Sequence, residues 1–235
     1  MHPTTLDALW NAVAGDVSRA GRDQTAAAKL LEEVAVALGN PLKWEGAAKA
    51  MGMASGATAR EYTELLGEAF TLLTVYFWDL SGRGFQPSRQ RKVYFLDPLF
   101  AAVAPRLMPG ARRPPAAALV ENAVAVGLFR SAAATLTQAA PAPGAIGYWR
   151  STNGRELDFV VPSRDRGRGG RLPVEVKGDA DAGIGRARDA VRRSFGEGLV
   201  VSRRAFDPTG PVPVLPAHVL LAGLSETPRR EAALG

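Results

Sequence analysis

Two short stretches of alternating polar and apolar residues constrain the fold of this chain more than any other feature. Residues 156–161 include Asp158, and residues 173–177 include Glu175 and Lys177. Alternation with a period of two is typical of half-buried β-strands. Because successive strand side chains point to opposite faces, Glu175 and Lys177 are predicted to share one face of a strand. Two adjacent strands can therefore bring an aspartate, a glutamate and a lysine into one small volume.

These three residue types suit phosphodiester hydrolysis assisted by a metal ion. Mg²⁺ prefers oxygen ligands and usually keeps several waters, so one or two carboxylates are enough to hold it. A bound divalent ion polarises a phosphoryl oxygen and lowers the pKa of its coordinated water. An ammonium group could orient the attacking water or stabilise the charge of the transition state. We therefore predict Asp158 and Glu175 as ligands of Mg²⁺ or Mn²⁺ and Lys177 as the catalytic cation.

Glu121 is a further candidate carboxylate, upstream of both strands. It is the only acidic residue of the apolar segment 116–129, which is predicted to form a buried helix. An unpaired buried carboxylate is costly, which suggests a specific use for this one. We predict that Glu121 is an additional metal ligand or a general base.

Lys177 stands out because most basic residues of this chain are arginine. It is the only lysine downstream of Lys92. A coding bias that favours arginine would be expected to place arginine here as well, unless the ammonium group itself is needed. The alternative is that Glu175 and Lys177 form a surface ion pair along an edge strand, with no role in catalysis.

An ordered series of segments over roughly residues 25–222 carries a resemblance to a known family. In chain order the segments are residues 60–66, 92–97, 119–122, 148–151, 156–160, 174–177 and 214–220. They resemble the C-terminal region of a group of bacterial and archaeal AAA+-type ATPases, a domain of unknown function with a PD-(D/E)xK nuclease fold. The resemblance implies a winged-helix domain followed by a restriction-endonuclease-like core, and an ATPase partner in cis or in trans. It implies less about activity, because many members have no established reaction.

The P-loop ATPase domain that precedes this region in the family has no counterpart in the sequence. No Gly-Lys-Ser or Gly-Lys-Thr occurs, so the phosphate-binding loop cannot be built. The glycine-rich residues 166–171 lie between two predicted strands and are expected to form a flexible hairpin tip. The chain is therefore expected to be either a fragment of a longer ATPase or a derivative that has lost its motor.

Composition excludes several other classes of protein. A chain of 235 residues, 46% of them hydrophobic, can bury one sizeable core or two smaller ones. The absence of cysteine excludes disulfides and thiolate metal sites and is typical of the reducing cytoplasm. His2 and His218 are the only histidines, which argues against a histidine-based zinc site or a Ser-His-Asp triad. The sequence shows neither a transmembrane run nor a signal peptide, so we expect a cytoplasmic protein.

The net charge of +6 is unevenly distributed. Residues 1–80 carry 6 basic and 10 acidic side chains, whereas residues 81–235 carry 23 basic and 13 acidic ones. Basic surfaces attract a phosphate backbone through counterion release, so DNA is the predicted partner and the second half its binding surface. The alternative is that the arginines only keep the protein soluble.

The first part of the chain is predicted to contain helices followed by a wing. Residues 44–51 and 58–70 are predicted to form a helix-turn-helix, and residues 72–78 and 92–96 to form strands flanking a loop. In the second helix Arg60 is the only basic residue among several glutamates, so we expect a connector or protein-interaction module rather than a major-groove reader. The wing could contact a nucleic-acid backbone through Arg83, Arg89, Arg91 and Lys92.

The second part is predicted to follow the order αβββαβ of a nuclease core. The predicted strands are residues 147–150, 155–161, 172–177 and 198–201, with a helix over residues 182–195. Tyr148 and Arg150 could position a phosphate, whereas Trp149 is expected in the core. The helix could line a DNA groove with Arg186, Arg188, Arg192 and Arg193.

The sequence therefore predicts an α/β protein in three parts. Residues 1–97 are expected to form the helical and winged-helix connector, residues 98–226 the mixed-sheet nuclease-like domain, and residues 227–235 a disordered tail. The leading function is metal-dependent phosphodiester hydrolysis on DNA. The alternative is a catalytically silent module that binds nucleic acid or protein and works beside an ATPase.

Overall fold

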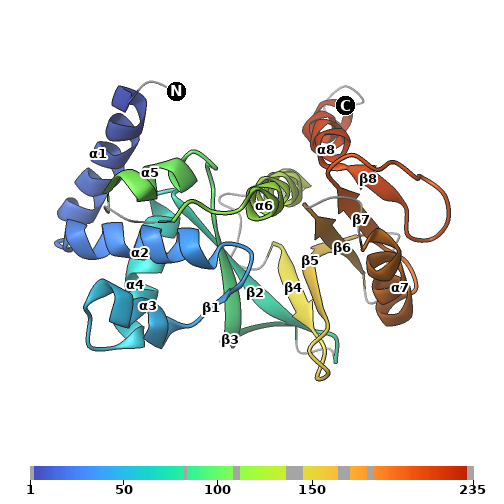
Figure 1. Cartoon of the computed structure of the whole chain (residues 1–235), viewed down its shortest axis with the longest axis horizontal. Helices are drawn as coiled ribbons and strands as arrows, with labels where there is room; N and C mark the ends of the chain where they lie inside the picture. The colour runs from blue at the N-terminus through green and yellow to red at the C-terminus, as the bar shows by residue number, and fades with distance from the viewer. Residues whose placement is uncertain are drawn as a thin grey trace. The chain divides into compact units, whose positions relative to one another are not determined.

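The computed structural model describes residues 3–81, 84–107, 112–135, 145–163, 170–178 and 183–231. It is an α/β structure with a mixed sheet in the order β1-β3-β2-β4-β5-β6-β7-β8 (Figure 1). The strands are β1 (Pro41–Leu42), β2 (Leu72–Asp79), β3 (Gly84–Phe95), β4 (Gly147–Arg150), β5 (Glu156–Pro162), β6 (Arg171–Lys177), β7 (Leu199–Ser202) and β8 (Val214–Pro216). The predicted α/β class is confirmed. None of the described helices is long and apolar enough to cross a membrane.

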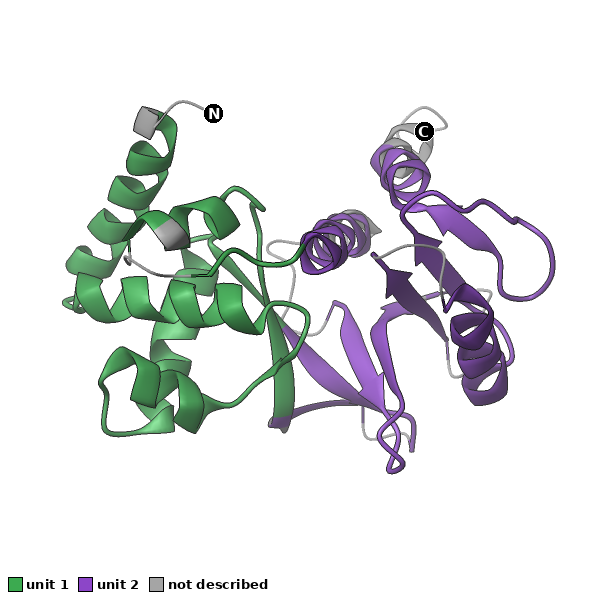
Figure 2. Ribbon diagram, in the orientation of Figure 1, with its two compact units in different colours: residues 1–74, 90–115 green, residues 75–89, 116–235 purple. Residues whose placement is uncertain are grey.

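The chain divides into two compact units, shown in different colours in Figure 2. The first unit contains residues 1–74 and 90–115, and the second contains residues 75–89 and 116–235. This division differs from the expected boundary at residue 97, because β2 and β3 each continue from one unit into the other. Each unit is described below by itself.

Helix α2 (Gln24–Ala37) is central to the first unit. It contacts α1 (Pro3–Arg19), α3 (Trp44–Met51), α4 (Gly56–Glu68) and α5 (Phe100–Leu107). Its buried residues include Leu30, Leu31 and Val34. Helix α5 belongs here rather than with the second unit, because its apolar residues Phe100 and Val103 are buried and it packs on α1 and α2.

Local signals set the ends of the helices in this unit. The Asp23 side chain accepts a hydrogen bond from the Thr25 N–H at 2.8 Å and caps α2. Ser55 caps α4 in the same way, through the Thr58 N–H. Gly52 ends α3 with φ 78°, a left-handed conformation that glycine adopts without a steric penalty. Helices α3 and α4 therefore occupy the predicted helix-turn-helix segments.

The second unit has the predicted element order. Helix α6 (Ala116–Thr135) is followed by β4, β5 and β6, then by α7 (Ile184–Phe195) and β7. Strand β5 pairs antiparallel with β4 and β6, whereas β6 pairs parallel with β7 and β7 with β8. Helix α6 packs on β5 and β6, and α7 packs on β6 and β7. One hydrophobic cluster joins Val191 and Phe195 of α7 to Val160 and Val200 of the sheet.

The structure adds three elements that the sequence pattern did not predict, β1, β8 and α8 (Ala217–Glu231). Strands β1 and β8 are too short to show a periodic pattern, and each depends on pairing with another strand, β1 with the distant β3 and β8 with β7. Helix α8 packs on α6 and continues to Glu231, so the tail expected from Thr227 is helical through Glu231.

Gly178, directly after Lys177, allows the end of β6 to approach α6 closely. A Cβ atom at this position would lie 2.5 Å from Ala117 Cα and 2.8 Å from the Ala117 carbonyl oxygen. Both neighbours are backbone atoms, which cannot move aside as the tip of a side chain can. The glycine therefore sets how close the helix that carries Glu121 lies to the strand that carries Lys177.

We expect Gly178→Ala to lower the free energy of unfolding by about 1–3 kcal/mol, the usual cost of overpacking. Gly223→Ala is the matched control, because Gly223 lies within α8 and a Cβ atom there meets nothing within 4 Å. That change should raise stability by roughly 0.5–1 kcal/mol through helix propensity. Urea unfolding of both variants tests the close approach, and equal stabilities would contradict it.

Candidate functional site

Strand β6 positions Glu175 and Lys177 in the interior of the sheet. Its residues pair with β5 on one side and with β7 on the other, where Glu175 lies opposite Val200 and Lys177 opposite Ser202. The strand is therefore not an edge strand. The ion pair of the alternative interpretation is present, but it lies on an inner strand and not along an edge.

Glu175 and Lys177 are in direct contact, as their spacing on one strand predicted. The Lys177 Nζ atom donates a hydrogen bond to Glu175 Oε1 at 2.5 Å. The Glu175 side chain is only 10% exposed, whereas that of Lys177 is 34% exposed. The second carboxylate oxygen, Glu175 Oε2, is buried and has no hydrogen-bond partner. A buried acceptor without a partner is costly, so this oxygen is a candidate for binding a ligand.

Asp158 of β5 is held beside these two residues. Its Oδ2 atom accepts a hydrogen bond from the Val176 backbone N–H at 2.9 Å. Val176 lies between Glu175 and Lys177 in β6, so this bond ties the carboxylate to the strand that bears both. The side chain of Asp158 thus serves as the acceptor for a backbone donor of the neighbouring strand.

Burial and crowding change the protonation of Glu175. Burial, followed by the nearby charge of Asp158, raises the pKa of Glu175 to about 7, although Lys177 acts in the opposite direction. Burial lowers the pKa of Lys177, but the carboxylates of Glu175, Asp158 and Glu121 outweigh it, and the net shift is upward. Lys177 is therefore a stable ammonium group.

Glu121 on α6 contributes to the same site. Glu121 is half-buried, and its charge is close enough to raise the pKa of Lys177. The neighbouring Asn122 is fully buried. The structure thus brings together the four residues that the sequence singled out, with Asp158, Glu175 and Lys177 in a hydrogen-bonded group and Glu121 near the ammonium.

The donor atoms suit a hard cation in part. Asp158 and Glu175 offer carboxylate oxygens, and the buried Glu175 Oε2 lacks a partner that a cation would supply. One or two carboxylates with several waters are a common Mg²⁺ site. Over the described residues, however, no group of three or more acidic, histidine or cysteine side chains is arranged to hold a metal ion. Glu121 therefore does not complete a three-carboxylate set in this arrangement.

Helix α7 carries the predicted arginines, and they do not share one environment. Arg186, Arg192 and Arg193 are exposed. Arg188 is bound to the β7–β8 segment, where its guanidinium donates to Asp207 Oδ2 at 2.6 Å and to the Thr209 carbonyl oxygen at 3.0 Å. These hydrogen bonds give Arg188 a structural role that its sequence position did not indicate.

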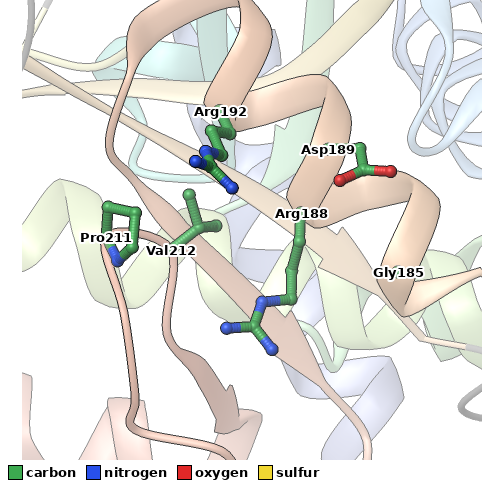
Figure 3. A pocket seen from close by; sticks show the side chains of 6 residues that line it. All are labelled: Gly185, Arg188, Asp189, Arg192, Pro211 and Val212. Carbon is green, nitrogen blue, oxygen red and sulfur yellow. The ribbon is translucent and has the colours of Figure 1, made fainter.

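A surface hollow of about 320 Å³ lies beside these arginines. Figure 3 shows the side chains of Arg188 and Arg192 extending from α7 toward the segment that contains Pro211 and Val212. Asp189 also lines the hollow, so the lining carries both positive and negative side chains.

Three other residues with predicted contact roles are not available on the surface. Arg91 is buried and stacks on Trp44, with 4.3 Å between its Cζ atom and the ring centroid, and Lys92 is fully buried. Tyr148 is 1% exposed and packs edge-on against Phe77, so it belongs to the core and does not position a phosphate. The predicted roles of Arg91, Lys92 and Tyr148 are wrong, because these strand positions face the interior.

The remaining predicted residues keep exposed positions or fall outside the described part of the chain. Arg150 and Arg89 are exposed, and Arg89 lies over the Phe77 ring at 4.9 Å. Trp149, expected in the core, packs against Phe195 with ring centroids 5.5 Å apart. Arg83 and most of the glycine-rich hairpin, residues 164–169, are outside the described residues.

Sequence reasoning missed Asp207 and Thr209, which bind Arg188, and Arg171, whose guanidinium lies 4.1 Å from the Trp78 ring centroid. No local pattern signals these interactions, because each joins residues from different elements. Comparison with family models, with curated proteins and with solved structures finds no match to this chain.

We expect the metal-free protein to become less stable as the pH rises from about 4.5 to 7. The unfolded Glu175 ionises near 4.5 whereas the folded group ionises at about 7, so the folded state holds the extra proton between these values. The stabilisation is complete below pH 4.5 and is lost as the pH passes 7. Its upper limit is about 3 kcal/mol, from 1.36 kcal/mol per pKa unit.

Glu175→Gln should remove this part of the pH dependence and leave the variant more stable than the parent at pH 8. Urea unfolding in EDTA at several pH values measures the free energy of unfolding of both proteins. In the difference between the two, the contributions of the other ionisable groups cancel. Glu45→Gln, at an exposed position of α3, should follow the parent at every pH. A constant difference between parent and Glu175→Gln would show that Glu175 is ionised in both states.

Proposed function

We propose that this protein hydrolyses phosphodiester bonds of DNA with the help of a divalent cation, Mg²⁺ or Mn²⁺. The observation that carries the proposal is the buried Glu175, which lies on an interior strand in contact with Lys177 and beside Asp158, with one oxygen unpartnered. Such a cluster costs stability, and perturbed carboxylates beside a specific charge partner are typical of functional sites.

Each residue has a distinct part in the proposed reaction. The cation, when bound by Asp158 and Glu175, supplies charge that polarises the phosphoryl oxygen and acidifies a water molecule. Lys177, whose side chain is 34% exposed, stabilises negative charge on the phosphate or orients the attacking water. Glu121 lies near this ammonium group and acts as a general base or holds Lys177 in position.

The fold and the partners of this activity are also proposals. The order α6-β4-β5-β6-α7-β7, with the candidate residues on β5 and β6, supports a restriction-endonuclease-like core. The succession of α3, α4, β2 and β3 supports a winged-helix connector. The resemblance to the C-terminal region of AAA+-type ATPases supports an ATPase partner in cis or in trans. A cytoplasmic location agrees with the absence of cysteine.

One observation favours the second candidate function, a catalytically silent module that binds nucleic acid or protein. The described residues contain no group of three metal-ligating side chains. A site with two carboxylates would hold a cation more weakly than one with three. The two functions differ in whether the protein cleaves DNA once it has bound a metal ion.

Lys177→Ala should lower the rate of DNA cleavage by about 100-fold or more, as the loss of one charge-stabilising group does in other enzymes. Metal affinity should remain largely intact, because an ammonium group is not a ligand. Plasmid nicking with Mg²⁺ or Mn²⁺, stopped by EDTA, measures cleavage, and calorimetry measures binding of the metal ion. Asp158→Asn should lose both properties while its amide oxygen can still accept the Val176 hydrogen bond.

Lys49→Ala is the matched control, because Lys49 is an exposed lysine of α3. It should cleave at the parental rate. Cleavage that survives both Lys177→Ala and Asp158→Asn would come from a contaminant and would leave the hydrolase proposal without support. A metal-binding but inactive parent would favour the silent module.

The exposed arginines of α7 should account for part of the affinity for duplex DNA. Replacing Arg186, Arg192 and Arg193 with alanine should flatten the plot of log affinity against log salt by about 0.9 for each phosphate that is no longer neutralised. Arg188 is left in place because it holds Asp207. Fluorescence anisotropy over a range of salt concentrations measures the slope, and an unchanged slope would place the duplex on another surface.

A further inference from the structure

The segment that follows β7 begins at the same end of the sheet as Lys177 and then turns back, so that Asp207 pairs with Val214 of β8. Strands β6 and β7 are parallel, and Lys177 at the end of β6 lies opposite Ser202 at the end of β7. Parallel neighbours leave the sheet at a common edge. Residues 203–206 therefore begin beside the candidate catalytic lysine, and Phe206 lies at most about 14 Å along the chain from Ser202.

This segment is held in a fixed conformation at both ends. The Ser202 hydroxyl donates a hydrogen bond to the Ala205 carbonyl oxygen at 2.8 Å. The Asp207 backbone exchanges two hydrogen bonds with Val214, at 2.9 and 2.7 Å. The Asp207 carboxylate also accepts hydrogen bonds from Arg188 and Thr209, which offset its charge. Phe206 therefore lies between two residues whose backbone is hydrogen-bonded.

The side chains of this segment combine an exposed aromatic ring with two exposed arginines. Phe206 is 62% exposed. Arg203 and Arg204 are exposed, and neither forms an ion pair with any residue in the described part of the chain. Aromatic rings beside basic side chains are typical of proteins that bind single-stranded nucleic acid, because every base has a face that can stack.

We propose that Arg203, Arg204 and Phe206, in the segment that leaves β7 next to Lys177, bind single-stranded DNA. The arginines contact backbone phosphates, and the Phe206 ring stacks on an unpaired base. The bases of an intact duplex are already stacked on each other, so this interaction selects single-stranded or frayed DNA. This proposal rests on the proposed nuclease function, because it specifies which form of DNA that nuclease prefers.

The test is a binding measurement without metal, so that it does not depend on cleavage. A labelled oligothymidylate of roughly 12 nucleotides, within the usual site size, and a duplex of the same length are titrated in EDTA by fluorescence anisotropy. Phe206→Ala should weaken binding of the single strand about tenfold and leave duplex binding within about twofold. Phe206→Trp, which keeps an aromatic ring at this position, should bind the single strand as tightly as the parent.

Matched controls are available in the first unit. Phe70 is also exposed, at 74%, so Phe70→Ala removes an equivalent ring and should change neither affinity. Arg112 and Arg113 are adjacent and exposed, so their double alanine variant matches that of Arg203 and Arg204 in charge. Only the Arg203 and Arg204 variant should flatten the salt dependence of single-strand binding.

The outcomes separate this proposal from the nuclease proposal. Unchanged single-strand affinity in Phe206→Ala, or an equal loss for the duplex, would overturn the stacking role even if the protein cleaves DNA. Selective loss for the single strand would support it even if the parent proves inactive. Thermal unfolding should show that Phe206→Ala is as stable as the parent, because the ring is exposed.

Discussion

The contact between Glu175 and Lys177 imposes the strongest constraint on the second unit, because it places two charged groups on an interior strand. A glutamate side chain that is only 10% exposed needs a hydrogen-bonding partner, and Lys177 Nζ supplies it at 2.5 Å. The ammonium group gains further stabilisation from Asp158 on β5 and from Glu121 on α6. Three elements must therefore meet at one point. Burial, and after it the charge of Asp158, raises the pKa of Glu175 to about 7.

The local packing follows from this requirement. Helix α6 must come close enough for Glu121 to act on Lys177, and Gly178 permits that approach because any larger residue would meet the backbone of Ala117. Strand β5 must place Asp158 within reach of the Val176 N–H. On the other side of β6, the parallel β7 places Ser202 opposite Lys177, and Arg203 and Arg204 follow Ser202 directly.

Sequence alone was sufficient where a local pattern repeats. The alternation around Asp158 and Glu175 predicted both strands, and spacing on one strand predicted the contact between Glu175 and Lys177. The sequence was not sufficient where the position of a side chain depends on residues that are distant in the chain. Arg91 and Tyr148 looked like surface residues, yet the faces they occupy are covered. The bond from Arg188 to Asp207 joins different elements, and no periodicity predicts it.

The arginines show why net charge is a poor guide to a binding surface. Arg188 ties α7 to the β7–β8 segment, and Arg91 and Arg171 stack on tryptophan rings, so these cations serve the fold. The others differ in distance from Lys177. Helix α7 follows β6, so its first turns, with Arg186, lie nearer the end of β6 than its last turn, which is about 10 Å further along for Arg193. The exposed arginines at the Lys177 end of the sheet therefore include those at the start of α7, Arg203 and Arg204 after β7, and Arg150, which lies opposite Glu156 at the start of β5.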